Sequence, residues 1–259
     1  MPALWSSASK ADWDSAWDAY ESTVKASDRD GLVALDNWFR TSLPTLLHER
    51  DPDAYIKKEE LVKLMEWKLK KGKWRPQLMK FVTSLEAKEV ENASRTALKE
   101  IQGGGDLKTA VTALCELKGI GPATASAVLA AYDNDVPFMA DEALEALASI
   151  IGPRKYTLPH YLAFADQLRA KAQWLRKQSK ADKGEEWTAQ RVQLALYASA
   201  HCAVAKAIAP KAAKVKAEKV STKRKQGPEA DAEKADKPLA ATVDTETTGL
   251  RRSKRTRAQ

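Results

Sequence analysis

The sequence predicts an all-α protein. Apolar residues recur at three- and four-residue intervals through most of the first 208 positions, which is the period of one face of a helix. No segment shows the alternation of apolar and polar residues expected of a half-buried strand. Proline and glycine stand between the periodic segments, where they begin or end helices. With 259 residues and 44% hydrophobic content, the chain can bury the core of one large helical domain or of two lobes that share an interface.

The first three helices follow from local patterns. An apolar face from Trp13 to Val24 predicts the first helix, and one from Leu32 to Phe39 predicts a second that stops before Pro44. A third helix is expected over 58–71, because Gly72 follows it directly.

Proline, glycine and aspartate mark the boundaries of the next three helices. The fourth begins at Pro76 and includes Leu85, and the fifth covers 90–102 until the glycines at 103–105 end it. Asp106 is then suited to cap a sixth helix that reaches Leu117.

Four further helices complete the folded part. They are expected over 122–132, 141–151, 158–178 and 185–208. The last one is apolar around much of its circumference, so it should be buried. Beyond Pro210 the chain loses aromatic residues and gains Lys, Glu, Pro and Thr. We therefore expect a helical domain at 1–210 and a disordered basic tail at 211–259.

The positive charge is concentrated in that tail. The formal net charge of the whole chain is +8. Residues 211–259 contain 14 Lys and Arg and 7 Asp and Glu, a net charge of +7. Residues 1–210 contain 29 Lys and Arg and 28 Asp and Glu, a net charge of +1. Any DNA-binding face on the folded part must therefore be a local patch. The basic clusters 223–225 and 251–255 are typical of nuclear import signals and of nonspecific DNA contact, although a solvated linker has the same composition. We expect a nuclear protein.

Cysteine usage and hydropathy exclude several classes of protein. The chain has two cysteines, Cys115 and Cys202, which are too few for a four-cysteine iron–sulfur or zinc site. Each lies in an apolar helical pattern, so we expect both to be buried, reduced thiols. No run of eighteen apolar residues occurs, and the N-terminus lacks the pattern of a signal peptide. We expect a monomeric intracellular protein that uses no metal or cofactor and does not enter a membrane.

The most informative segment is the short turn within 117–125, which reads Leu-Lys-Gly-Ile-Gly-Pro-Ala-Thr-Ala. Gly119 and Gly121 permit a tight connection between two helices and let the backbone approach an anion closely. Ile120 should turn inward and lock the turn. Pro122 suits the first turn of the following helix.

This nonapeptide resembles the helix-hairpin-helix motif of DNA-binding proteins, apolar-x-Gly-apolar-Gly-x-x-Thr-Ala, here within a hairpin at 107–132. A purely structural hairpin is the alternative. The resemblance implies double-stranded DNA as the partner. The hairpin residues expected to contact it are Gly119, Ile120, Gly121 and Thr124.

The region after the hairpin resembles the helix-hairpin-helix DNA glycosylases, which have an endonuclease III-like fold. Asp141 lies twenty residues beyond Gly121, after a short apolar run, as the family's catalytic Asp does. The resemblance implies a two-lobed fold over 58–208, in which Asp141 stabilises positive charge on the sugar or activates water. A helix N-cap is the alternative role for Asp141. Family members that also cut the backbone carry a lysine where this chain has Ala123, so the resemblance implies no lyase step.

A basic segment at 68–75 is the second candidate DNA contact. It interleaves five positive charges with tryptophan at the end of a helix, a composition suited to phosphates. The positive charges expected to bind phosphates are Lys68, Lys70, Lys71, Lys73 and Arg75. Trp67 and Trp74 are expected in the core. Together with the hairpin and the basic C-terminus, this segment resembles the eukaryotic Amun-like branch of the glycosylase superfamily.

Three functions fit these patterns. The first is a monofunctional DNA glycosylase that removes a base by hydrolysis, with Asp141 as the catalytic carboxylate. The second is a non-catalytic DNA-binding or scaffold protein that keeps the same fold, since no base-reading set of residues can be identified. The third is a helical protein-interaction domain, which the lysine-rich segment disfavours.

Overall fold

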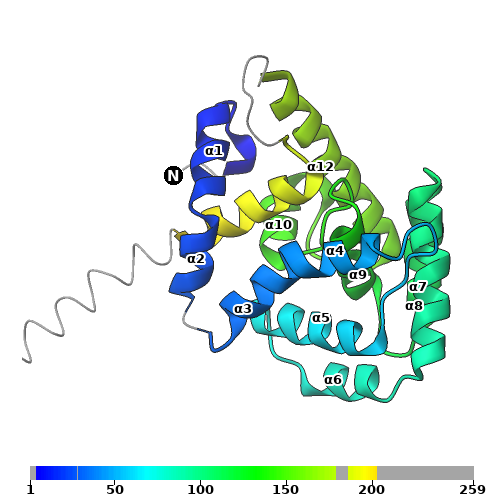
Figure 1. Ribbon diagram of the computed structural model, residues 1–259. Helices are drawn as coiled ribbons and strands as arrows, with labels where there is room; N and C mark the ends of the chain where they lie inside the picture. The colour runs from blue at the N-terminus through cyan, green and yellow to red at the C-terminus, as the bar shows by residue number, and fades with distance from the viewer. Residues whose placement is uncertain (1–3, 28, 179–185, 203–259) are drawn as a thin grey trace, which may run out of the picture. The chain divides into compact units, whose positions relative to one another are not determined.

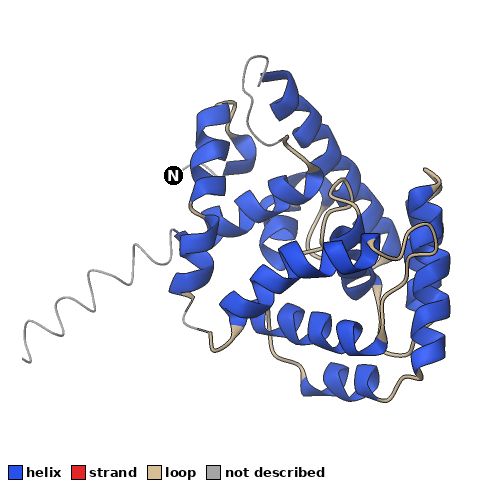
Figure 2. Ribbon diagram, in the orientation of Figure 1, coloured by secondary structure: helices blue, strands red, loops and turns tan. Residues whose placement is uncertain are grey.

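Helices form all the regular secondary structure of residues 4–27, 29–178 and 186–202, the part of the chain that the computed structural model describes (Figure 2). These residues all belong to one compact unit within Met1–Ala213. The predicted tail at 211–259 and the end of the last predicted helix, 203–208, lie outside the described residues. None of the described helices is long and apolar enough to span a membrane.

The N-terminal helices are shorter than the pattern predicted. The elements up to His48 are η1 (Leu4–Ser6), α1 (Lys10–Asp18), α2 (Tyr20–Ala26), α3 (Leu32–Asn37), the π-helical turn η2 (Trp38–Ser42) and α4 (Leu43–His48). The second helix stops before Pro44 as expected, since α3 ends at Asn37, but the backbone does not leave helical geometry at the proline. Pro44 instead lies in the first turn of α4, where its missing N–H leaves no hydrogen bond unmade.

The middle helices follow their predicted boundaries closely. They are α5 (Lys58–Lys71), α6 (Pro76–Thr83), α7 (Ala87–Gln102), α8 (Leu107–Cys115) and α9 (Pro122–Tyr132). Asp106 caps α8 as expected, because its carboxylate accepts a hydrogen bond from the N–H of Lys108 at 3.1 Å.

The C-terminal helices are α10 (Asp141–Ala146), α11 (Ala148–Ile151) and α12 (Leu158–Gln178), followed by a helical segment at 189–202. The predicted helix over 141–151 is therefore two helices. The break is at Leu147, whose φ of −98° and ψ of 3° depart from helical values. Its side chain is fully buried, so packing holds the chain in this bend.

Helix α9 lies at the centre of the fold (Figure 1). Every side chain from Thr124 to Ala131 is buried, and α9 packs against α4, α5, α7, α8 and α12. Its alanines allow these neighbours to approach closely. This central position fixes both ends of α9, including the glycine turn at its N-terminus.

Candidate nucleic-acid interface

The predicted hairpin is present: α8 and α9 are joined by the short turn 116–121. The N–H of Ile120 donates to the carbonyl of Leu117 at 3.0 Å and closes the turn. Ile120 is buried, as expected for the residue that locks it. Thr124, in the first turn of α9, is also buried.

The two hairpin glycines have different structural requirements. Gly119 has a φ of +85°, and a Cβ added there would lie 2.5 Å from Cβ of Phe81 in α6. Gly121 has an ordinary φ of −112°, and a Cβ added there would meet no atom within 4 Å. The fold therefore requires glycine at 119. It places no such demand on 121, where the small residue leaves open space beside the backbone.

Three backbone donors of this turn and of the start of α9 are unpaired. Within the described part of the chain, the N–H groups of Gly119, Gly121 and Ala123 have no acceptor. Unpaired N–H groups at the start of a helix carry partial positive charge and favour anions. The turn is therefore an anion-attracting surface.

A cavity of about 220 Å³ opens beside the turn. Its lining comes from α5, the following loop, α6, the hairpin, the segment before α10, the first turn of α10, and Tyr156. The residues that line it are Lys68, Leu69, Lys71, Gly72, Lys73, Arg75, Leu78, Gly119, Gly121, Pro122, Ala123, Thr124, Phe138, Met139, Ala140, Asp141, Glu142 and Tyr156. The structure thus brings Asp141, three of the four hairpin residues and four of the five basic residues to one cavity. Ile120 and Lys70 do not line it.

The segment that delivers Asp141 to the cavity is held by side chains from three helices. The hydroxyl of Ser126 in α9 accepts a hydrogen bond from the N–H of Met139 at 2.9 Å. The amide oxygen of Gln190 accepts one from the N–H of Phe138 at 2.8 Å, and the hydroxyl of Tyr161 donates to the carbonyl of Pro137 at 3.1 Å. This buried support fixes the position from which α10 begins.

Asp141 is not a helix cap. Ala140 occupies the N-cap position, and the Asp141 carboxylate makes no capping hydrogen bond. Its Oδ1 accepts a hydrogen bond from the hydroxyl of Tyr156 at 2.7 Å, and its Oδ2 lies 3.3 Å from a guanidinium nitrogen of Arg154. Partial burial, the hydrogen bond to Asp141 and the charge of Asp141 together raise the pKa of Tyr156. The carboxylate therefore faces the cavity with two partners from the loop before α12.

Lys68 lines the same cavity, and its ammonium group makes no hydrogen bond or ion pair with any described residue. Burial, the largest cause, and the positive charge of Arg75 lower the pKa of its ammonium group to about 8, against the opposing effect of Asp141. The unprotonated fraction of Lys68 near neutral pH is therefore larger than that of an ordinary lysine.

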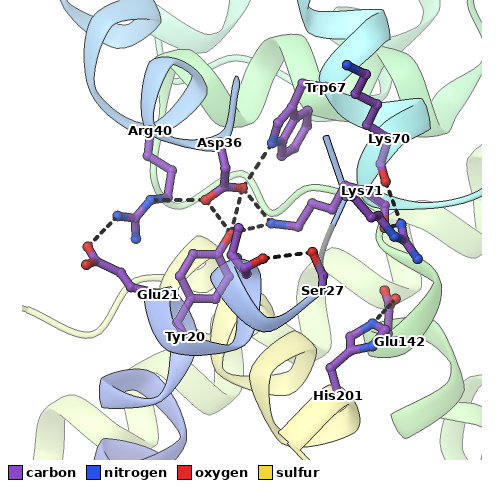
Figure 3. A network of polar contacts seen from close by, with 12 residues as sticks. Tyr20, Glu21, Ser27, Asp36, Arg40, Trp67, Lys70, Lys71, Glu142 and His201 are labelled. Carbon is purple, nitrogen blue, oxygen red and sulfur yellow. Dashed lines mark hydrogen bonds and ion pairs between the residues drawn. The ribbon is translucent and has the colours of Figure 1, made fainter. Parts of the chain in front are cut away.

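Lys71 is bound inside the protein (Figure 3). Its side chain is 3% exposed, and its Nζ lies 2.8 Å from Oδ1 of Asp36 and also donates to the hydroxyl of Tyr20. Burial opposes ionisation of Asp36, but the charge of Lys71 and the hydrogen bonds from Lys71, Trp67 and Tyr20 hold its pKa below the usual value. The expected phosphate contact by Lys71 is therefore replaced by a buried ion pair with Asp36.

The remaining basic residues separate into two groups. Lys70 lies on another face of α5 and pairs with Glu66 at 3.1 Å, so it is not directed at the cavity. Lys73 and Arg75 are exposed on the loop between α5 and α6. They are the cations best placed for phosphates at the cavity mouth.

The two tryptophans of this segment also differ. Trp67 is fully buried, as predicted, and its ring stacks on that of Phe39 with centroids 3.6 Å apart. Trp74 is 52% exposed, so the prediction that it lies in the core is wrong. Trp74 follows Gly72, which ends α5, and precedes Pro76, which begins α6. Its loop therefore lies between two helices.

Two lining residues carry no sequence signal that identified them. Glu142 accepts a hydrogen bond from Nε2 of His201 at 2.8 Å. Burial opposes ionisation of Glu142, but this hydrogen bond and a backbone hydrogen bond keep its pKa below the usual value. Tyr156 is brought to Asp141 by a turn that no local pattern specifies. Cys115 and Cys202 are free thiols, as expected, but they are partly exposed rather than buried.

No family model, no curated protein and no solved structure matches the chain. The resemblance to the glycosylases therefore rests on the hairpin, Asp141 and the basic segment.

Proposed function

We propose that the protein binds double-stranded DNA across the hairpin and the loop 72–75, and that its cavity receives a base turned out of the duplex. In this proposal the described helices are part of a two-lobed fold like that of the helix-hairpin-helix DNA glycosylases. The observation that supports it most is the convergence of the hairpin turn, a cationic loop and Asp141 on one cavity.

Phosphate binding would use two kinds of donor. The unpaired N–H groups of Gly119, Gly121 and Ala123 suit a phosphate held at the start of a helix. Lys73 and Arg75 lie on the neighbouring loop and would hold a second point of the backbone. The tail would add nonspecific attraction through its excess of positive charge.

Base excision would use the Asp141 carboxylate. As the base departs, positive charge develops on the sugar, and a carboxylate in a partly apolar cavity stabilises it or activates the attacking water. Leu69, Phe138 and Met139 supply apolar lining beside Asp141, and such surroundings strengthen the electrostatic effect. The product of this reaction is an abasic site.

A non-catalytic DNA-binding protein is the second candidate, and one observation favours it. Both oxygens of Asp141 already have partners, the hydroxyl of Tyr156 and the guanidinium of Arg154. A reactive role requires the sugar to displace at least one of them. A protein that only binds DNA can keep both contacts and use them to hold the cavity wall.

The charge clusters at 223–225 and 251–255 support a nuclear location. We also propose that the protein acts as a monomer, because the hairpin, the cationic loop and Asp141 that the proposal requires all belong to one chain.

The test uses duplexes that carry a panel of alkylated, deaminated and mismatched bases. The full chain should release free base from at least one of them. The Asp141→Asn variant should bind the same duplex and release at least a hundredfold less, because it removes the charge and little of the shape. Glu145→Gln is the matched control, since Glu145 also lies 3.3 Å from Arg154 but does not line the cavity; it should keep full release.

The outcomes separate the two candidates. Full release by the Asp141→Asn variant excludes Asp141 as the catalytic group. Tight binding of every duplex with release from none supports the non-catalytic protein. Absence of duplex binding overturns both.

A further inference from the structure

Lys68 is the partly buried lysine of the cavity whose amine has no bound partner, whereas Lys73, also in the lining, is exposed on the loop after α5. Lys71, the other lysine of α5 in the lining, is bound to Asp36, and Lys70 is paired with Glu66 outside the cavity. Lys68 has no partner in the described ranges, and it lines the cavity together with Arg75 and Asp141. An unpaired amine in a partly enclosed cavity costs stability without gaining a local contact, so its position calls for a function.

The state of this amine suits nucleophilic chemistry. A lysine attacks a carbonyl only when it is unprotonated. With a pKa of about 8, roughly a tenth of the Lys68 side chains are unprotonated at pH 7, against about three in ten thousand for a lysine with an unperturbed pKa. The reactive fraction is therefore about 300-fold larger. Removal from water and a neighbouring cation are the two conditions that activate lysine nucleophiles.

We propose that Lys68 forms an imine with an aldehyde bound in the cavity, namely C1′ of the ring-opened deoxyribose at an abasic site in DNA. This inference rests on the proposed function, which supplies both the DNA and the abasic product. It assigns Lys68 a covalent role in place of the phosphate contact that the sequence suggested. It also shows why Ala123 does not settle the question of lyase chemistry, because the amine can come from α5.

The reaction is balanced without an oxidant or reductant. The Lys68 nitrogen bonds to C1′, and the carbonyl oxygen leaves as water. The imine acidifies the proton on C2′, and loss of that proton to a base breaks the C3′–O bond and releases the 3′ phosphate. Water then hydrolyses the imine and restores the lysine. Asp141 lines the same cavity, and its carboxylate takes the proton once Tyr156 or Arg154 has released one of its oxygens.

The experiment uses the full chain and a duplex with a preformed abasic site, so base release is not needed. Borohydride reduces an imine to a stable secondary amine, and the covalent adduct is measured on a denaturing gel and its site by peptide mass. We expect an adduct at Lys68 and strand cleavage without alkali. Lys68→Arg keeps the positive charge but cannot form an imine, so it should lower trapping at least a hundredfold while binding the duplex. Lys70→Arg is the matched control and should trap as the unaltered chain does.

The pH profile is a second readout. The initial trapping rate should rise with pH and level off above about 8, since the unprotonated amine is the reacting form. The charged and titratable groups that share the cavity with Lys68 are Lys71, Lys73, Arg75, Asp141, Glu142 and Tyr156. Of these, Arg75 and Asp141 act on its pKa, so Arg75→Gln should shift the midpoint to higher pH.

The results distinguish this inference from the proposed function. Binding of the abasic duplex with no adduct at pH 9, or an adduct that persists in the Lys68→Arg variant, overturns the imine at Lys68 and leaves DNA binding and base release intact. Failure to bind any duplex overturns the proposed function and this inference with it. An adduct that disappears only in the Lys68→Arg variant supports the imine at Lys68 and the DNA-binding part of the proposed function.

Discussion

Replacing the two hairpin glycines one at a time should separate a folding requirement from a binding requirement. At Gly119, alanine must adopt a φ of +85°, which costs about 1–2 kcal/mol. Its Cβ would also lie 2.5 Å from Cβ of Phe81, and relieving such an overlap costs about 1–3 kcal/mol. The Gly119→Ala variant should therefore lose roughly 2–5 kcal/mol of unfolding free energy.

At Gly121 the same substitution should be harmless to the fold. Its φ of −112° is open to any residue, and no atom lies within 4 Å of the added Cβ. Alanine there should leave stability unchanged or raise it by about 0.4–1 kcal/mol, because it restricts the unfolded chain. A larger side chain, as in Gly121→Val, should instead obstruct an approaching phosphate. Losing a charge-assisted hydrogen bond of about 1.5–3 kcal/mol weakens duplex binding roughly 10- to 150-fold.

Urea unfolding followed by circular dichroism measures the first effect, and fluorescence anisotropy with a labelled duplex measures the second. Gly103→Ala is the control, since Gly103 has an ordinary φ of −78° and does not line the cavity. Wild-type stability of the Gly119→Ala variant would refute the steric reasoning. Unchanged affinity of the Gly121→Val variant, with its helicity intact, would remove the hairpin from DNA binding.

Two further predictions follow from α5 and the loop after it. Lys71→Met should lower the free energy of unfolding by about 3–5 kcal/mol in urea titrations, because it leaves the Asp36 carboxylate buried without its cation. Adding Asp36→Asn to this variant should restore part of the lost stability. An unchanged urea midpoint in the Lys71→Met variant would contradict the pairing. Trp74→Ala should weaken duplex binding roughly 5- to 150-fold if the exposed ring stacks on a base worth about 1–3 kcal/mol. Its unfolding midpoint should stay unchanged, and a large decrease would mean that Trp74 supports the fold instead.

Helix boundaries were predictable where a single residue decides them. Gly72 ends α5, Pro76 and Pro122 begin α6 and α9, and Asp106 caps α8, each by a local backbone effect. Pro44 marks a start as well as an end, because α3 ends before it and, after a π-helical turn, it lies in the first turn of α4, where its missing N–H breaks no hydrogen bond.

Only the local part of the candidate site was predictable from the sequence. The hairpin and Asp141 lie in short patterns whose spacing can be read directly. The residue that pairs with each charged side chain cannot be read in this way. Lys68, Lys70 and Lys71 look alike in the sequence, yet one is unpaired in the cavity, one is paired on the surface and one is buried against Asp36. Helical geometry separates Lys70 from the other two, because residues three apart share a face and adjacent residues do not.

The difference between Lys68 and Lys71 comes from residues far away in the chain. Asp36 of α3, 35 positions before Lys71, supplies the opposite charge that lets Lys71 stay buried and ionised. Lys68 has no such carboxylate bound to it, and the charge of Asp141 only partly offsets burial and Arg75. Two lysines one helical turn apart therefore have different chemistry. Lys71 joins α5 to the N-terminal helices, and Lys68 is left with the unpaired amine that a covalent role at the cavity requires.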